Sequence, residues 1–297
     1  MASEKHAPLS PVGPHFDRGN AVVENSVNAL LQHFRVSLLL YVRNKVALLY
    51  GYLFPILYYV AFLSLFPNEK PALMRHMGEV LTIAILGAAC LSMPTAIVNE
   101  RERGVWRRYR IAPIAAGGLL ASTLAARYAA LLVAGAIQLL LGMRIGHWAP
   151  LHPLDLLLVF SAASFAFLGI GLVFAMLADT VGAVQGLGQI IFLPMLVLGG
   201  VAVPLSRLPD WAQHLSAFLP GRYAVESVQA CVTGEGLGTL GFQVFALLLI
   251  GLCGCIAGTK LFRWDAHERF LSSSSKVWIW IALGAWLVVG VLAEIRR

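Results

Sequence analysis

The chain has 297 residues, of which 59% are hydrophobic and only 12% are charged, and its mean hydropathy is +0.76. A soluble domain carries about 25% charged residues, so this composition excludes a soluble domain and predicts an all-α polytopic membrane protein. The formal net charge of +7 does not indicate a nucleic-acid partner, because excess Lys and Arg in a membrane protein collect in its cytoplasmic loops.

A polar N-terminal segment precedes the apolar part of the chain. Residues 1–20 are interrupted by prolines and contain no apolar run, so they are not a cleavable signal peptide and are predicted to be a disordered cytosolic tail. Apolar residues then recur at helical spacing, which predicts an amphipathic helix lying in the membrane plane before the first span. Its apolar face comprises Val27, Leu30, Leu31, Phe34, Leu38, Tyr41 and Val42.

Six apolar runs reach or approach the roughly 20 helical residues that cross a bilayer core. With the in-plane helix they form a predicted transmembrane domain over residues 21–270. Arg127 is the one charge inside these runs, and we expect it to extend to the headgroup water. The runs are Val46–Phe66, Val80–Val98, Leu119–Leu141, Leu156–Ala178, Val181–Val203 and Leu237–Thr259.

Two further segments are ambiguous. Leu208–Val232, between the fifth and sixth runs, has the pattern of two short helices, which form a re-entrant hairpin, an outer cap or an ordinary amphipathic loop. Residues 271–297 are predicted to be a linker and a C-terminal hydrophobic segment. In that segment the hydrophobicity of Val277–Ala293 favours an extra span, whereas the basic end, Arg296 and Arg297, favours an interfacial helix.

The distribution of basic residues predicts the orientation. Lys and Arg are concentrated before the first run, between the second and third, and after the sixth, and these segments are therefore assigned to the cytosol. The chain is accordingly predicted to be a multi-pass protein of the inner (plasma) membrane with a cytoplasmic N-terminus.

The most charged segment, Asn99–Pro113, contains five arginines and two glutamates. Gly104 permits a bend, and Pro113 ends the helix before the third run. The segment is either a basic anchor at the headgroups or a short rigid helix that docks a soluble partner. On a continuous helix four of its charged residues share one face: Glu100, Arg103, Arg107 and Arg110.

The stretch "NERERGVWRRYRIAPI" resembles the hallmark of the type-2 ABC exporter permeases. The core of the match comprises Glu100, Arg101, Glu102 and Gly104, and Arg107, Arg110 and Pro113 match the following part. The resemblance covers roughly residues 21–270. It includes the in-plane helix, Arg127 early in the third run, the outer short helices and an "LFRWD" ending at Leu261–Asp265.

The resemblance implies a permease subunit that pairs with a second permease, as a homodimer or heterodimer, and rests on a cytosolic ABC ATPase. It implies export of a hydrophobic or amphipathic solute by alternating access. No GxxxxGK sequence followed by Ser or Thr is present, so ATP and Mg are expected on the partner ATPase and no cofactor on this chain. The implied ATPase-coupling residues are Glu100, Arg101, Glu102, Arg103, Gly104, Arg107, Arg110 and Pro113.

The second and fifth runs are the implied solute path or dimer interface. In the fifth run, Gln185 and Gln189 lie one turn apart, and Gly182 and Gly186 form a small-residue pair that permits close helix approach. Packing within one subunit is the alternative for these residues. The implied path or interface residues are Ser92, Thr95, Asn99, Gln185, Gln189, Gly182 and Gly186, and Leu208–Val232 is the implied exit gate.

The remaining polar groups do not form a recognisable catalytic or metal-binding set. His147, His152 and Asp155 lie in one outer loop without helical ligand spacing, so no metal site is expected there. Two other functions remain as alternatives to a permease: a multi-pass membrane enzyme acting on lipids, and a non-transporting scaffold that recruits a cytosolic protein. Membrane lipid is an expected contact of the chain, and nucleic acid is not.

Overall fold

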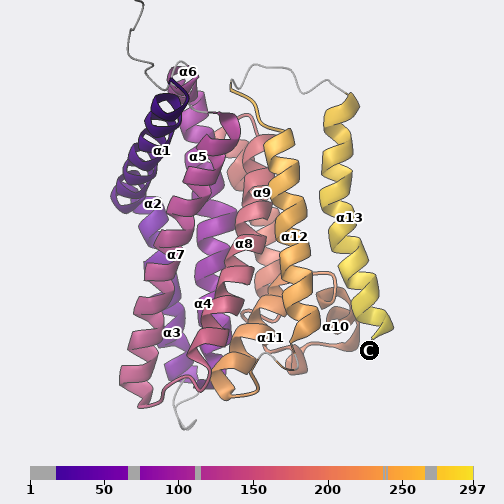
Figure 1. Ribbon diagram of the computed structural model, residues 1–297. Coiled ribbons are helices and arrows are strands. Elements are labelled where there is room, and N and C mark those ends of the chain that lie inside the picture. Colours follow the sequence, from indigo (N-terminus) through magenta and orange to yellow (C-terminus); the bar gives the residue numbers. More distant parts are fainter. Residues whose placement is uncertain are drawn as a thin grey trace, which may run out of the picture.

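The computed structural model describes residues 18–65, 74–110, 115–236, 238, 240–264 and 273–296. Within these ranges the regular structure is helical, without strands, and the long helices stand side by side in one bundle (Figure 1). The prediction of an all-α polytopic membrane protein is confirmed. Five helices in these ranges have the length and apolar character of a span: Met74–Glu102, Ala116–Gly146, Pro153–Leu177, Gly241–Lys260 and Val277–Ile295.

The bundle has two distinct ends. We call the end that carries α6 (Val105–Tyr109) the motif end, and the end that carries α10 (Asp210–Ser216) and α11 (Pro220–Thr233) the far end (Figure 1). The helices between them run alternately in the two directions, with α4 and α5 as two parts of one span, as the predicted topology requires (Figure 1). They are α3 (Phe54–Leu65), α4 (Met77–Leu86), α5 (Met93–Glu102), α7 (Ala116–Gly146), α8 (Pro153–Leu177), α9 (Val181–Val197) and α12 (Gly241–Lys260).

The N-terminal helix α1 (Arg18–Arg43) packs on α7 through a face that overlaps only in part with the predicted apolar face, at Tyr41. Its buried residues include His33, Ser37 and Tyr41, one turn apart, whereas Val27 and Leu31 of the predicted apolar face are exposed. In a membrane protein the apolar face of such a helix is free to contact lipid, and its more polar face contacts protein. The helix also begins at Arg18, inside the predicted tail; residues 1–17 lie outside the described ranges.

Arg127 does not extend to water as expected. It is 4% exposed, and its guanidinium lies 5.0 Å from the centre of the Tyr41 ring, a cation–π contact that joins α7 to α1. The expectation was wrong because α1 covers this part of α7. After Asn44 the chain continues through α2 (Lys45–Leu48) and the π-helical turn η1 (Leu49–Leu53) into α3.

The second span is the most buried helix of the bundle. It runs through η2 (Met74–His76), α4, the π-helical turn η3 (Gly87–Ser92) and α5. The π-helical turn immediately precedes Pro94, which has no N–H to complete an α-helical bond. The carbonyls of Ala89 and Cys90 in this turn face glycines, because a Cβ on Gly171 of α8 would overlap Ala89 O and one on Gly188 of α9 would lie 2.7 Å from Cys90 O.

Gly188→Val is therefore expected to force α9 away from the second span. Overpacking a tight core site costs about 1–3 kcal/mol of unfolding free energy, and here the opposing atom is backbone that cannot rotate away. Thermal unfolding of the detergent-solubilised chain should show a lowered midpoint. Gly284→Val is the control, because a Cβ there meets no atom within 4 Å. Equal midpoints for the two variants would contradict the close approach.

The fifth span is shorter than its apolar run. The run extends to Val203, but α9 ends at Val197, three residues after Pro194. The chain then turns through Gly200, whose φ of +75° is in the left-handed region that favours glycine. It continues through the 3₁₀ turn η4 (Leu205–Arg207) to the far end.

The two predicted short helices at the far end are present as α10 and α11. α11 packs deeply, and Gln229 joins it to the start of the second span: its Nε2 donates to Met74 O at 2.8 Å and its Oε1 accepts from Gly78 N at 2.9 Å. α10 is more peripheral, with Trp211 61% exposed. The pair therefore covers the far end of the bundle, and its second helix forms part of the bundle; whether it is a re-entrant hairpin or an outer cap stays a prediction.

The C-terminal helix α13 (Ser273–Ile295) runs beside α12 from the motif end to the far end, as a span would (Figure 1). Lys260 Nζ at the end of α12 lies 5.6 Å from the centre of the Trp278 ring of α13, in a cation–π contact. At the far end Glu294 of α13 accepts a hydrogen bond from His214 of α10 at 3.0 Å, and this bond joins α13 to α10.

Candidate functional site: the charged motif and its connections

The charged segment forms two helices instead of one. α5 ends at Glu102, Gly104 adopts a left-handed φ of +69°, and α6 begins at Val105. The bend that Gly104 was expected to permit is present, so the four charged residues from Glu100 to Arg110 do not share one continuous helical face. α6 lies beyond the end of α5, at the motif end (Figure 1).

Trp106 fixes α6 to the bundle. It is 2% exposed, its Nε1–H donates to Glu100 Oε2 at 3.3 Å, and its ring stacks on Phe262 with centroids 5.1 Å apart. Phe262 in turn makes an edge contact with Trp264 at 4.9 Å. The tryptophan thus connects α6 to α5 and to the segment that follows α12.

Arg101 and Glu102 connect the motif to the turn between α8 and α9. Arg101 is 2% exposed and donates from Nη2 to Ala178 O. Glu102 Oε1 accepts a hydrogen bond from Val181 N at 3.2 Å, at the first residue of α9. A carboxylate is favourable at a helix N-terminus, where backbone N–H groups lack partners.

Arg263 holds the same turn from the other side. Its Nη2 donates to Met176 O at 2.9 Å and to Asp179 Oδ1 at 2.8 Å. The turn therefore lies between two arginines, Arg101 and Arg263. Arg263 belongs to the "LFRWD" stretch, for which the residue pattern alone indicated no role. The presence of a basic residue between two aromatic residues directly after a span was the available sign that this stretch packs on the bundle.

The implied coupling residues have different positions in the structure. Arg101 is buried, Gly104 forms the bend, and Pro113 lies outside the described residues. The side chains on the surface of the motif end are Glu102, Arg103, Arg107, Arg108 and Arg110. The structure thus separates a surface set from a set that holds the motif in place.

The implied path residues fall into two groups. Gly182, Gln185 and Gly186 are exposed on α9 and Gln189 is half-buried, and a Cβ on either glycine would meet no atom within 4 Å. On the second span Ser92 is 1% exposed, while Thr95 is half-buried and donates to Leu91 O at 2.6 Å. Asn99 lines a polar pocket at the motif end. A path or interface role for these residues stays a prediction.

His33 joins three helices at the motif end. Its Nδ1 shares a hydrogen bond with Ser122 Oγ of α7, and its ring lies edge-on to Tyr109 of α6 at 5.1 Å. Burial lowers the pKa of the His33 imidazole below its usual value near 6.5, so the neutral form is favoured in the folded chain.

Acidification is expected to weaken the packing of α1. The pKa of His33 is lower in the folded chain than in the unfolded chain. Its contribution to the stability of the folded state is therefore complete above about pH 6.5 and falls as the pH drops from there through the folded-state pKa. Limited proteolysis of α1 in the purified chain should accelerate between pH 7 and pH 5. His33→Gln should remove that acceleration, and an unchanged pH profile in the variant would contradict the assignment.

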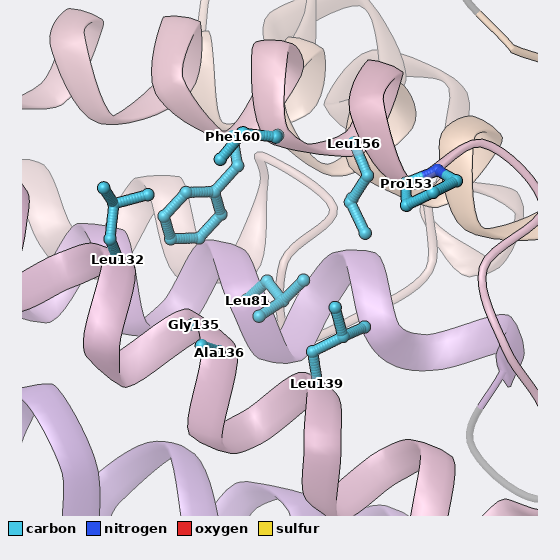
Figure 2. A pocket seen from close by; sticks show the side chains of 9 residues that line it. Leu81, Leu132, Gly135, Ala136, Leu139, Pro153, Leu156 and Phe160 are labelled. Atoms are coloured by element: carbon cyan, nitrogen blue, oxygen red, sulfur yellow. The ribbon is translucent and has the colours of Figure 1, made fainter.

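An apolar cavity of about 210 Å³ lies between α4, α7 and α8, toward the far end. Figure 2 shows Leu156 of α8 pointing towards Leu81 and Leu139, and Phe160 of α8 pointing towards Leu132 and Gly135 of α7. The lining of this cavity includes no ionisable side chain, so the cavity offers no charged group that would orient a polar ligand. Nearby, His152 Nδ1 lies 3.9 Å from Asp155 Oδ2. In the described part of the chain no group of three His, Cys, Asp or Glu side chains lies close enough together to bind a metal ion.

Comparisons with known proteins agree with this architecture. The family model of the ABC-2 type transporter matches residues 29–232. Nodulation protein J of Sinorhizobium fredii is 24% identical over 175 residues, which cover 59% of this chain and 67% of that protein. Nodulation protein J of Rhizobium meliloti is 22% identical over 205 residues, covering 69% of this chain and 74% of that protein.

YvfS of Bacillus subtilis, which is named as a transport permease, is 22% identical over 189 residues, covering 60% of this chain and 75% of that protein. No solved structure matches the chain significantly. The family model covers more than half of the chain and includes the whole charged motif. The chain therefore belongs to the ABC-2 type transporter family and is a multi-pass membrane permease.

Proposed function

We propose that the chain is the membrane subunit of an ATP-driven exporter and that its motif end faces the cytosol. The observation that carries this proposal is the form of the motif. α6 presents Arg107 and Arg108 on its surface, while Trp106 on the same helix is buried in the bundle. A surface anchor would not need a buried tryptophan, whereas a docking element must be rigidly joined to what it moves.

The contacts of the motif suggest how a push on α6 would reach the spans. A displacement of α6 would be transmitted to the end of α12 through the stack of Trp106 on Phe262. It would be transmitted to the α8–α9 turn through the hydrogen bonds of Arg101 and Glu102. The second and fifth spans would then move together, because Arg101 and Glu102 at the end of α5 bind the turn before α9 and the first residue of α9. In this proposal a separate ABC ATPase binds ATP and Mg, and closure of the ATPase pair supplies the push.

The exposed face of α9 supports a solute path or a contact with a second permease. Gly182 and Gly186 leave this face open within the subunit, and Gln185 adds an amide between them. Such a surface suits close approach of another helix. The proposed cargo is a hydrophobic or amphipathic solute that moves outward along this face, and α10 and α11 would gate its exit at the far end.

Reversing the surface charges of the motif tests the docking proposal. Glu102→Lys combined with Arg103→Glu is expected to leave the chain in the membrane fraction but to reduce copurification with its ATPase by tenfold or more, since roughly 1.4 kcal/mol corresponds to a factor of ten. The matched control is Arg144→Glu, an exposed reversal near the far end of α7. Normal copurification of the double variant would overturn the assignment of the docking surface.

ATP-dependent transport distinguishes a permease from a scaffold. Inverted vesicles that contain the chain and its ATPase are expected to accumulate amphipathic solute only with ATP and Mg. A scaffold would retain the ATPase through the same motif but would give equal accumulation with and without ATP. That result, with normal ATPase binding, would overturn the exporter proposal while preserving the docking surface.

A further inference from the structure

Neither the docking surface nor the proposed path uses Arg127, a buried arginine that lines a pocket at the motif end. The pocket has a volume of about 260 Å³ and lies between the end of α1, the end of α5 and the first half of α7, and its lining includes Asn99, Glu100 and Arg103 of the motif. The lining residues that matter here are Leu40, Asn44, Asn99, Glu100, Arg103 and Arg127.

Arg127 is the principal feature of this pocket. It is 4% exposed, one side of its guanidinium is covered by the buried Tyr41 ring, and its Nε and Nη1 make no hydrogen bond to any described residue. A buried cation without hydrogen-bonded partners is costly, and such groups in membrane proteins mark functional sites. Arg127 is one of the residues that line the pocket, so a ligand in the pocket would lie beside its side chain.

The charges of the pocket favour an anion. Glu100 is the acidic group in the lining; its carboxylate accepts the Trp106 N–H, and it attracts the Arg127 guanidinium electrostatically without a hydrogen bond to its Nε or Nη1. Two arginines, Arg103 and Arg127, against one glutamate leave a net charge of +1 (2 − 1). A guanidinium binds phosphate through two parallel N–H donors, and the amide of Asn99 in the lining provides a further polar group.

We propose that this pocket binds a phosphate ester, and that the ester is the headgroup of an anionic phospholipid from the leaflet at the motif end. The lipid assignment follows from the surface beside the pocket: Leu40 in its lining is 47% exposed and the adjacent Leu39 is 61% exposed. A lipid can place its phosphate at Arg127 while its acyl chains lie along this apolar face of α1. The site joins α1, α5 and α7, and it is separate from the exposed α9 face.

The test is lipid binding to the complete chain by native mass spectrometry, with phosphatidylglycerol and phosphatidylcholine as probes. The wild type is expected to retain phosphatidylglycerol in preference to phosphatidylcholine. Arg127→Gln should weaken the phosphatidylglycerol complex roughly tenfold or more, because a charge-assisted pair is lost. Arg35→Gln is the matched control, since it removes an exposed arginine of α1 outside the pocket and should change little.

Glu100→Gln separates ligand binding from a purely structural role of Arg127. Gln can still accept the Trp106 N–H, but it removes the one negative charge of the lining, so phosphatidylglycerol should bind more tightly. If the Arg127–Glu100 region only supported folding, both variants would weaken binding or neither would change it, and the proposal would be overturned. The expected tighter binding by Glu100→Gln can be measured without a folded Arg127 variant, and unchanged or weaker binding by Glu100→Gln would by itself overturn the proposal.

Photocrosslinking of the unmodified chain provides a second measurement. A phosphatidylglycerol probe with a photoreactive group near the phosphate should label peptides containing Leu40–Asn44 and Asn99–Arg103. Labelling confined to other helices would overturn the site. Glycerol phosphate is the soluble arm: if it protects the wild type against thermal unfolding but phosphatidylglycerol does not bind, the phosphate chemistry holds and the lipid assignment is wrong. Absence of both effects overturns the proposal.

Discussion

Trp106→Ala is expected to leave the permease inserted in the membrane and bound to its ATPase, but to abolish ATP-dependent transport. The substitution removes the stack on Phe262 and leaves a cavity where a 2%-exposed side chain was packed. Buried Trp→Ala changes cost about 3–5 kcal/mol, which is enough to detach α6 from the bundle locally. The ATPase would still dock on the arginines of α6 but would no longer be rigidly connected to α12.

The measurement is the ratio of transport to ATP hydrolysis in proteoliposomes. Trp106→Phe should retain much of the ratio, because it keeps the aromatic stack and loses only the hydrogen bond to Glu100, worth about 0.5–1.5 kcal/mol. Trp211→Ala, on the 61%-exposed tryptophan of α10, is the control for loss of an indole. A normal coupling ratio in Trp106→Ala would show that α6 does not transmit movement through this contact.

The second large effect is expected from removing both arginines that hold the α8–α9 turn. Arg101→Ala or Arg263→Ala alone should lower the free energy of unfolding by about 1–3 kcal/mol, since Arg101 donates to Ala178 O in the turn and Arg263 donates to Met176 O at the end of α8 and to Asp179 in the turn. Because both bind the same short turn, the remaining arginine should keep it in place in each single variant. The double variant should release it.

A double-mutant cycle measures this coupling. The loss in Arg101→Ala/Arg263→Ala is expected to exceed the sum of the single losses by more than about 0.5 kcal/mol, the usual limit of additivity for independent sites. Transport should fall further than either single variant predicts, because α5 and α9 would no longer move together. Additive stability losses within that limit would contradict a shared role at the turn.

Much of the fold follows from two simple properties of the sequence. Lengths of apolar runs are set by bilayer thickness, so the spans could be located, and the charge asymmetry of the loops predicted alternation between two ends. The short helices at the far end followed from turn residues around Trp211 and Pro220. The end of α9 was misplaced because Val201 and Val203 are apolar in a turn, where hydrophobicity alone does not distinguish helix from loop.

The candidate site was less predictable, because its geometry depends on contacts distant in sequence. Arg101 and Arg103 are neighbouring arginines in one motif, yet the first is buried against Ala178 and the second is exposed. No periodicity distinguishes them, since the bend at Gly104 decides which side chains face the bundle. Likewise, the sequence predicted that Arg127 extends to the headgroup water, because no local pattern shows that α1 covers this side chain.

Accessibility labelling from each side of the membrane tests most directly the claim that the motif end faces the cytosol and receives the ATPase. In a chain whose four native cysteines are replaced, Arg108→Cys and Trp211→Cys place a single thiol at the motif end and the far end, respectively. A membrane-impermeant maleimide is expected to label the Arg108→Cys variant only from the cytosolic side, and bound ATPase should protect it. Labelling of that position from the opposite side, or undiminished labelling in the ATPase complex, would contradict the claim.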